Sequence, residues 1–150
     1  DYTKKFIEFM DVGTLNQWNL NKVVPGSEIV EIINSKMPIE PTNPTYFGEV
    51  ASKYKYKDGS GEIGIIASVT QPFCGNCTRL RLSPDGNLYT CLFSDVGTNV
   101  SKLLRSNKNK KALKSLIQKT WMSRKDKYSV DRSKNPNKST KKVEMYHIGG

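Results

Sequence analysis

The order of apolar and polar residues near the beginning of the chain predicts a strand followed by a helix. Residues 5–13 are mostly apolar and predict a buried strand that ends in a loop. Ser27 has the residue type of a helix N-cap, and the isoleucines after it share one helical face: Ile29, Ile32 and Ile33. This part of the chain therefore predicts one β–α unit.

The next stretch favours extended structure. Residues 37–45 contain three prolines, which disfavour helix, so we expect an extended connector there. Residues 46–57 and 61–70 are both strand-like, and Asp-Gly-Ser-Gly at 58–61 joins them. This order predicts a β-hairpin whose second strand leads directly into the cysteine-containing segment.

The later part of the chain predicts helices and then polar chain. Residues 100–105 predict a short helix, and residues 110–121 a longer one with apolar and lysine faces. The apolar face holds Leu113, Leu116, Ile117, Thr120 and Trp121, and the other face holds Lys110, Lys111, Lys114 and Lys119. Residues 125–142 have little to bury and predict a loop or flexible chain, whereas residues 143–150 regain apolar positions and finish in two glycines.

All cysteines of the chain lie between the predicted hairpin that ends at residue 70 and the predicted helix that begins at residue 100. They are Cys74, Cys77 and Cys91. The residues between Cys77 and Cys91 alternate like a strand, turn at Pro-Asp-Gly, and become strand-like again. If the turn has three residues, Ser83 lies opposite Asn87, and Arg79 lies near Cys91. We therefore expect a hairpin that brings three sulfurs together.

The same hairpin contains two arginines that could bind an anion. Arg79 and Arg81 fall on one face of the first strand, because side chains alternate with a period of two. Leu80 and Leu82 fall on the other face. Two guanidinium groups beside the sulfurs suit bidentate contacts with phosphate oxygens.

Three thiolates leave the nature of the bound group open. Structural zinc takes four ligands, so zinc requires an outside donor, and His147 is the only histidine. An iron–sulfur cluster with three protein ligands keeps one iron open for a substrate. Three reduced cysteines without any metal are the third alternative. Spacing alone places zinc ahead of the cluster, and the metal-free alternative last.

Charge and length narrow the function classes. The 150 residues include 24 Lys or Arg and 14 Asp or Glu, a net charge of +10, so we expect a polyanionic partner: nucleic acid, an acidic membrane surface or a phosphorylated small molecule. The cysteine pattern disfavours a secreted disulfide scaffold and favours a reducing compartment. The chain has no apolar run that could span a bilayer and no segment like a signal peptide, so we expect a soluble protein.

Several segments together resemble the C-terminal part of the MoaA family, the radical S-adenosylmethionine GTP 3′,8-cyclases of molybdenum cofactor biosynthesis. The segments are residues 6–13, 46–51, 73–86, 91–93 and 145–150. The resemblance covers nearly the whole chain. Its middle motif is specific, because the cysteine spacing, the paired arginines and the final Gly-Gly occur together.

The resemblance implies a set of site residues and replaces the preference for zinc. Cys74, Cys77 and Cys91 match the ligands of a [4Fe–4S] cluster whose open iron receives the guanine of GTP. Arg79 and Arg81 match arginines that contact this substrate. Gly149 and Gly150 match a tail that reaches into the active site.

The resemblance also implies that the chain is a portion of a lyase. The family cleaves S-adenosylmethionine at another [4Fe–4S] cluster, held by a Cys-x3-Cys-x2-Cys motif that this sequence lacks, so we expect no catalysis by this portion alone. The expected fold is α/β, as an α+β fragment. Residues 1–45 would be the last part of an incomplete TIM-type barrel, with one late β–α unit. Residues 46–150 would be an antiparallel-hairpin region that binds the cluster and GTP and carries C-terminal helices.

Further expectations concern location and partners. The family implies a cytoplasmic protein, or a mitochondrial one in a eukaryote, with GTP as partner, no membrane, and a homodimer as an option for the full-length enzyme. Nucleic acid is disfavoured but defines the alternative function, a basic zinc module that uses the three cysteines and His147. A purely structural subunit without a ligand is the third class.

Overall fold

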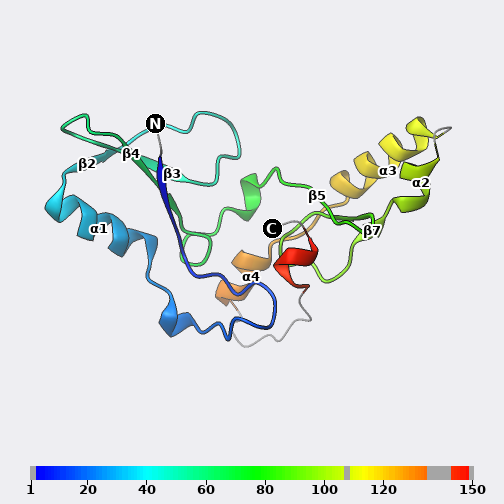
Figure 1. The fold of residues 1–150 in the computed structure, drawn as a ribbon, viewed down its shortest axis with the longest axis horizontal. Coiled ribbons are helices and arrows are strands. Elements are labelled where there is room, and N and C mark those ends of the chain that lie inside the picture. The colour runs from blue at the N-terminus through cyan, green and yellow to red at the C-terminus, as the bar shows by residue number, and fades with distance from the viewer. Residues whose placement is uncertain (1–2, 107–108, 135–142, 149–150) are drawn as a thin grey trace. The chain divides into compact units, whose positions relative to one another are not determined.

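The computed structural model describes residues 3–106, 109–134 and 143–148, and the chain divides into two compact units (Figure 1). Unit 1 consists of Asp1–Met10, Trp18–Cys77 and Ser129–Lys134. Unit 2 consists of Asp11–Gln17, Thr78–Tyr128 and Asn135–Gly150. The mixed α/β class is confirmed. The incomplete barrel and the expected boundary at residue 45 stay predictions.

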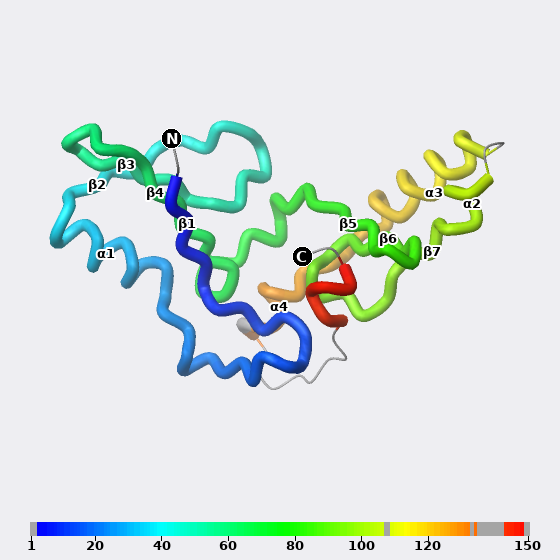
Figure 2. Tube along the Cα trace, viewed as in Figure 1, coloured from blue at the N-terminus to red at the C-terminus, as the bar shows by residue number. Residues whose placement is uncertain are grey.

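Unit 1 is built on a four-stranded sheet in the order β1-β4-β3-β2 (Figure 2). β3 (Ser52–Tyr56) and β4 (Glu62–Ile66) pair antiparallel, which confirms the hairpin predicted around residues 58–61. β1 (Lys4–Ile7) pairs with β4 in parallel. β2 (Ile39–Pro41) pairs antiparallel with β3, so the expected connector contains a short hydrogen-bonded strand. Its proline is tolerated because β2 lies at the edge of the sheet.

The helix α1 (Gly26–Lys36) connects β1 with the rest of the sheet. Ile29, Val30 and Ile33 pack against the buried core formed by Ile39, Ile63 and Ile65. The buried face of α1 differs from the predicted one at one position: Ile32 is 58% exposed, and Val30 packs on the core instead. The expected N-cap was also wrong. The helix begins at Gly26, after Pro25, and Ser27 lies inside its first turn.

β1 is shorter and more exposed than the sequence predicts. Its four residues are all exposed, including Phe6 at 37% and Ile7 at 55%. In the described sheet, β1 is an edge strand with β4 as its single neighbour. The prediction of a buried strand is therefore wrong for this chain, because burial of both faces requires more packing partners than the described residues supply.

Glu8 connects the end of β1 with two other segments of unit 1. Its side chain is 3% exposed. Oε1 accepts hydrogen bonds from the Gly26 N–H (2.7 Å) and the Thr70 hydroxyl, and Oε2 accepts from the Val69 and Thr70 N–H groups (2.7 and 2.9 Å). The carboxylate thus caps α1, which has no side-chain cap of its own, and fixes the chain after β4.

We expect Glu8→Gln to destabilise unit 1 by about 1–3 kcal/mol, because an amide NH2 would face buried N–H donors. Burial by itself raises the pKa of Glu8, but the bonds from Thr70, Gly26 and Val69 outweigh it and hold the pKa below the ordinary 4.5. The stabilisation is therefore complete above pH 4.5 and is lost as pH falls through the lower folded pKa. Denaturant unfolding measures it, with Glu31→Gln on the exposed side of α1 as control. A Gln variant as stable as the parent would contradict this role.

Unit 2 contains a three-stranded antiparallel sheet in the order β5-β6-β7. β5 (Arg81–Leu82) and β6 (Asn87–Tyr89) form the hairpin that the sequence predicts, and β7 (Thr98–Asn99) adds to β6. The predicted register is confirmed at the turn, where the Ser83 N–H donates to the Asn87 carbonyl (2.9 Å). Gly86 closes the turn at φ +83°, and a Cβ there would lie 2.7 Å from the Ser101 side chain. Only glycine fits this position.

The helices of the later chain agree with the prediction at two places and differ at a third. α2 (Ser101–Arg105) and α3 (Lys110–Met122) are both confirmed, and the apolar face of α3 is half-buried while its lysines are exposed. α4 (Tyr128–Lys134) forms where loop or flexible chain was expected. Its buried Arg132 donates to the Ser68 carbonyl (3.2 Å) and lies over the Trp18 ring, contacts that stabilise a helix of polar sequence. Residues 135–142, expected to be loop, lie outside the described residues.

Three short 3₁₀ turns complete the described structure: Leu20–Lys22, Cys74–Asn76 and Met145–His147. Among the helices of the described residues, none combines the length and the apolar character needed to cross a bilayer.

Candidate functional site

Cys74 and Cys77 are carried by the 3₁₀ turn Cys74–Asn76 at the end of unit 1. The turn is closed by hydrogen bonds from Asn76 N to the Phe73 carbonyl (3.3 Å) and from Cys77 N to the Cys74 carbonyl (3.4 Å). Residues three apart eclipse in this geometry, so the two cysteines lie on one side of the turn. Gly75 has no atom within 4 Å of a Cβ position. The tip of the turn is open.

Cys91 lies in unit 2, two residues after the end of β6. The Phe93 N–H donates to its Sγ (3.5 Å), and the Ser94 N–H donates to its carbonyl (3.3 Å). An N–H directed at sulfur stabilises negative charge on that atom, as in thiolates that ligate metals or clusters. All three cysteines are reduced thiols of intermediate exposure.

The loop around Cys91 is held from both sides by residues that the sequence did not single out. The hydroxyls of Thr90 and Ser94 both donate to the carboxylate of Asp126. Phe93 stacks on Tyr128 with ring centroids 4.4 Å apart and planes 16° apart. These contacts fix the segment on which Cys91 lies. Their partners are more than 30 residues away, so no local sequence pattern could predict them.

Asp11 supports the same region of unit 2. It is 2% exposed and accepts a hydrogen bond from the Tyr128 hydroxyl (2.6 Å). Asp11 lies in residues 6–13, one of the segments that resemble the family, and the sequence assigns it no chemical role. The structure gives it a structural role, because it orients the ring that stacks on Phe93.

The ligand set stays a prediction. Cys74 and Cys77 belong to unit 1 and Cys91 to unit 2. Within the part of the chain that the structure describes, no three His, Cys, Asp or Glu side chains gather into a metal-binding group. The chemistry of the donors still fits a cluster, because all three are thiols and one already receives an N–H bond at sulfur. Gly149 and Gly150 lie outside the described residues.

Arg79 and Arg81 are half-buried, whereas Leu80 and Leu82 are 37% and 50% exposed. This alternation of exposure agrees with an arginine face and a leucine face, but β5 contains only Arg81 and Leu82, so a shared face for Arg79 and Arg81 stays a prediction. Arg81 pairs with the buried Tyr89 across the β5–β6 ladder. The pairing of Arg79 with Cys91 stays a prediction, because β5 begins at Arg81.

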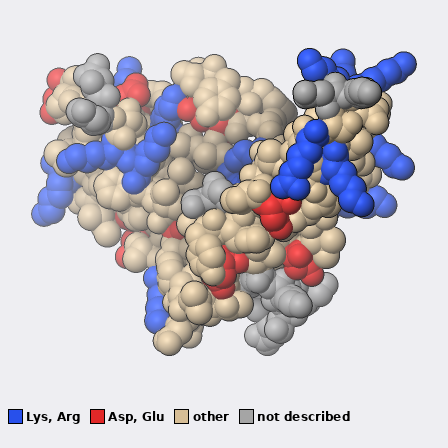
Figure 3. All heavy atoms as spheres, turned by 45° about the vertical axis from the view of Figure 1, so that its right-hand side comes forward, with Lys and Arg blue, Asp and Glu red and all other residues tan. Residues whose placement is uncertain are grey.

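Much of the positive charge lies on one part of unit 2. No Asp or Glu occurs between residues 96 and 125, a stretch that includes α2 and α3. Figure 3 shows Lys and Arg side chains gathered over these helices. The exposed ones on α3 are Lys110, Lys111, Lys114 and Lys119. Such a surface attracts polyanions in general and selects no particular partner.

His147, the candidate fourth zinc ligand, lies in unit 2 with its Nε2 3.6 Å from Asp85 Oδ2. Its side chain is 45% exposed. The imidazole therefore faces a carboxylate of the hairpin turn. This contact accounts for its position without a metal.

Comparison with known proteins identifies a family that this chain matches. Residues 2–130 match the family described as Molybdenum Cofactor Synthesis C. The chain is 44% identical over 170 residues to the GTP 3′,8-cyclase of Acidothermus cellulolyticus, covering 97% of this chain and 47% of that protein. It is 46% identical over 149 residues to the enzyme of the same name from Staphylococcus haemolyticus, covering 97% of this chain and 44% of that protein. The chain spans about half the length of the curated relatives it matches.

Proposed function

Because the chain belongs to the Molybdenum Cofactor Synthesis C family, we propose that it is the part of a GTP 3′,8-cyclase that holds a [4Fe–4S] cluster and binds GTP. The observation that carries the proposal is the set of three reduced cysteines. Two lie on one side of a tight turn, and the third receives an N–H bond at its sulfur. The complete enzyme would act as a lyase and would also require S-adenosylmethionine and another cluster.

Each candidate site residue has a defined task in this proposal. Cys74, Cys77 and Cys91 would hold the cluster, which when bound supplies an iron with an open coordination position for the nucleotide base. Arg79 and Arg81 would bind the phosphates of GTP. Their half-burial supports this task, because a partly desolvated guanidinium binds an anion more strongly than one in water. Gly149 and Gly150 would form a thin tail at the substrate.

The alternative function is a basic zinc module for nucleic acid, with Cys74, Cys77, Cys91 and His147 as ligands. The acid-free stretch between residues 96 and 125 favours it. The contact between His147 and Asp85 weighs against it, because the histidine already has a partner within unit 2. It also gives no reason for two half-buried arginines beside a cysteine motif.

Titration of GTP into the anaerobically isolated, cluster-loaded protein tests the proposed function. We expect saturable binding of GTP and weaker binding of a duplex oligonucleotide at the same molar concentration. The same titration after removal of the cluster should show a lower affinity for GTP, because the base loses its contact. Preference for the oligonucleotide would support the zinc module instead.

The chain by itself should not cleave S-adenosylmethionine. Its three cysteines do not form the Cys-x3-Cys-x2-Cys motif that the family uses for this step. With a supplied electron donor, release of 5′-deoxyadenosine should therefore stay at the level of the protein-free control. Release that depends on the cluster of this chain would contradict the assignment.

A further inference from the structure

The segment that ends the described chain, Val143–Ile148, is attached to unit 2 at several points. Ile148 has no exposed surface, although its neighbours Met145 and Tyr146 are exposed. The 3₁₀ turn Met145–His147 is closed by bonds from His147 N to the Glu144 carbonyl (3.0 Å) and from Ile148 N to the Met145 carbonyl (3.2 Å). A short turn of this kind is held in place by its contacts rather than by its own stability.

Glu144 makes the longest-range of these contacts. Its Oε1 accepts from both the backbone N–H (2.8 Å) and the hydroxyl (2.7 Å) of Thr14, 130 residues earlier. These bonds lower the pKa of Glu144, with the hydroxyl as the larger cause. The other oxygen lies where a Cβ of Gly13 would be, at 2.0 Å from the ideal position, and Gly13 has φ +67°. The loop after β1 is thus shaped to receive this carboxylate.

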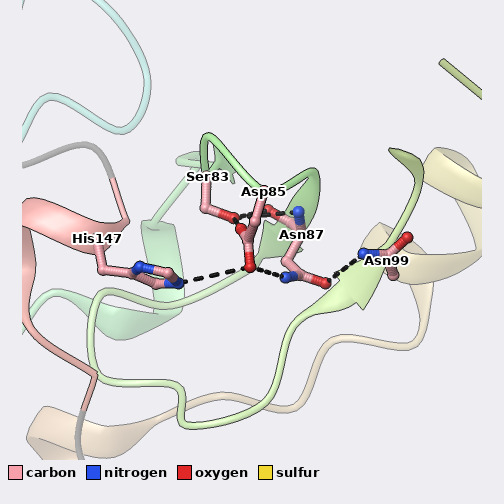
Figure 4. Close-up of polar contacts among 5 residues, drawn as sticks. All are labelled: Ser83, Asp85, Asn87, Asn99 and His147. Atoms are coloured by element: carbon pink, nitrogen blue, oxygen red, sulfur yellow. Dashed lines mark hydrogen bonds and ion pairs between the residues drawn. The ribbon is translucent and has the colours of Figure 1, made fainter. Parts of the chain in front are cut away.

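His147 makes the second contact, with Asp85 of the hairpin turn (Figure 4). Asp85 is itself fixed by the Ser83 hydroxyl and by the Asn87 side-chain amide (2.6 Å), and Asn87 in turn accepts from Asn99 (3.1 Å). The pKa of Asp85 is lowered, first by the Ser83 hydroxyl and also by His147. A carboxylate held in this way presents a fixed negative charge to the imidazole.

We propose that Glu144, His147 and Ile148 are positioning residues that anchor the C-terminal segment on unit 2. Glu144 contacts Gly13 and Thr14, and His147 contacts Asp85. The proposal rests on the proposed function in one respect: the anchored segment leads directly into Gly149 and Gly150. A tail of two glycines has no side chains that could fix it. The residues before the two glycines are therefore the ones whose side chains can hold this part of the chain.

Amide hydrogen exchange of His147 and Ile148, measured in the cluster-loaded protein, tests the anchor. We expect Glu144→Ala to accelerate exchange about tenfold, because both bonds from Thr14 are lost. Glu144→Gln keeps an oxygen that can accept both bonds, so its exchange should stay within about threefold of the parent. Asp95→Ala, an exposed acidic position in unit 2, is the matched control and should change nothing. If Glu144→Ala does not fold, Thr14→Val provides the same test with a smaller expected change.

The outcomes separate the anchor from the function. Unchanged exchange in Glu144→Ala, or equal exchange in the Ala and Gln variants, would overturn the anchor. Faster exchange in Ala and rescue by Gln would establish it. Turnover of GTP by the complete enzyme, with the same substitution in this portion, then addresses the tail. A lower kcat with unchanged KM in Glu144→Ala supports the role of the glycines. Full turnover despite fast exchange leaves the anchor intact and removes the tail from the proposed function.

Discussion

Replacing Cys91 by alanine is expected to leave the anaerobically isolated protein without the visible absorbance of an iron–sulfur cluster. A cluster with three protein ligands is held by only two when one thiolate is removed. In Cys91→Ala these two thiolates belong to a single exposed turn, so we expect the cluster to be lost. Cys74→Ala and Cys77→Ala should have the same effect. Iron and acid-labile sulfide, measured per chain, check the result.

The control for this prediction lies within the same turn. Asn76 is exposed and sits between Cys74 and Cys77, so Asn76→Ala alters the motif without removing a sulfur. It should keep the iron and sulfide content of the parent. Retention of full iron and sulfide in Cys91→Ala would exclude this cysteine from the ligand set.

Removing either Arg79 or Arg81 is expected to weaken GTP binding about tenfold to a hundredfold. Each charge-assisted bidentate contact with phosphate contributes roughly 1.5–3 kcal/mol. Lysine keeps the charge but not the planar pair of donors, so Arg→Lys should restore only part of the affinity. Calorimetric titration of GTP into the cluster-loaded protein gives these values.

Lys114→Ala is the matched control for the arginines. It removes one positive charge from the exposed face of α3, also in unit 2, and should change GTP affinity little at moderate salt. If both arginine variants bind GTP as the parent does, these residues are not the phosphate ligands. A loss of oligonucleotide affinity with unchanged GTP affinity would favour the nucleic-acid alternative.

The hairpin in unit 2 could be predicted down to its register because its turn is determined locally. Pro84, Asp85 and Gly86 supply the residue types that a three-residue turn needs, and the Ser83–Asn87 bond lies where the turn requires it. The apolar and lysine faces of α3 were also predictable, because they follow directly from the periodicity of a helix.

The misplaced cap of α1 shows where local prediction ends. Ser27 has the right residue type, but the carboxylate of Glu8, 18 residues earlier, already satisfies the Gly26 N–H. The same holds for α4, whose polar sequence predicts a loop until the contacts of Arg132 with Ser68 and Trp18 are known. Tertiary contacts override local preference in both cases.

The residues of the candidate site also fall into those that the sequence could indicate and those that only the fold reveals. The cysteines and arginines carry chemistry in their own residue types, so their spacing indicated them directly. Asp126, Asp11 and Glu144 act through partners distant in sequence, and only the fold brings those partners to them. Positioning residues of this kind have no signature in a single sequence.

The metal and sulfide content of the anaerobically isolated protein tests the central claim most directly. The proposed cluster predicts about four iron and four sulfide per chain with broad visible absorbance, and no stoichiometric zinc. One zinc per chain, with neither iron nor sulfide, would contradict the cyclase assignment and support the zinc module.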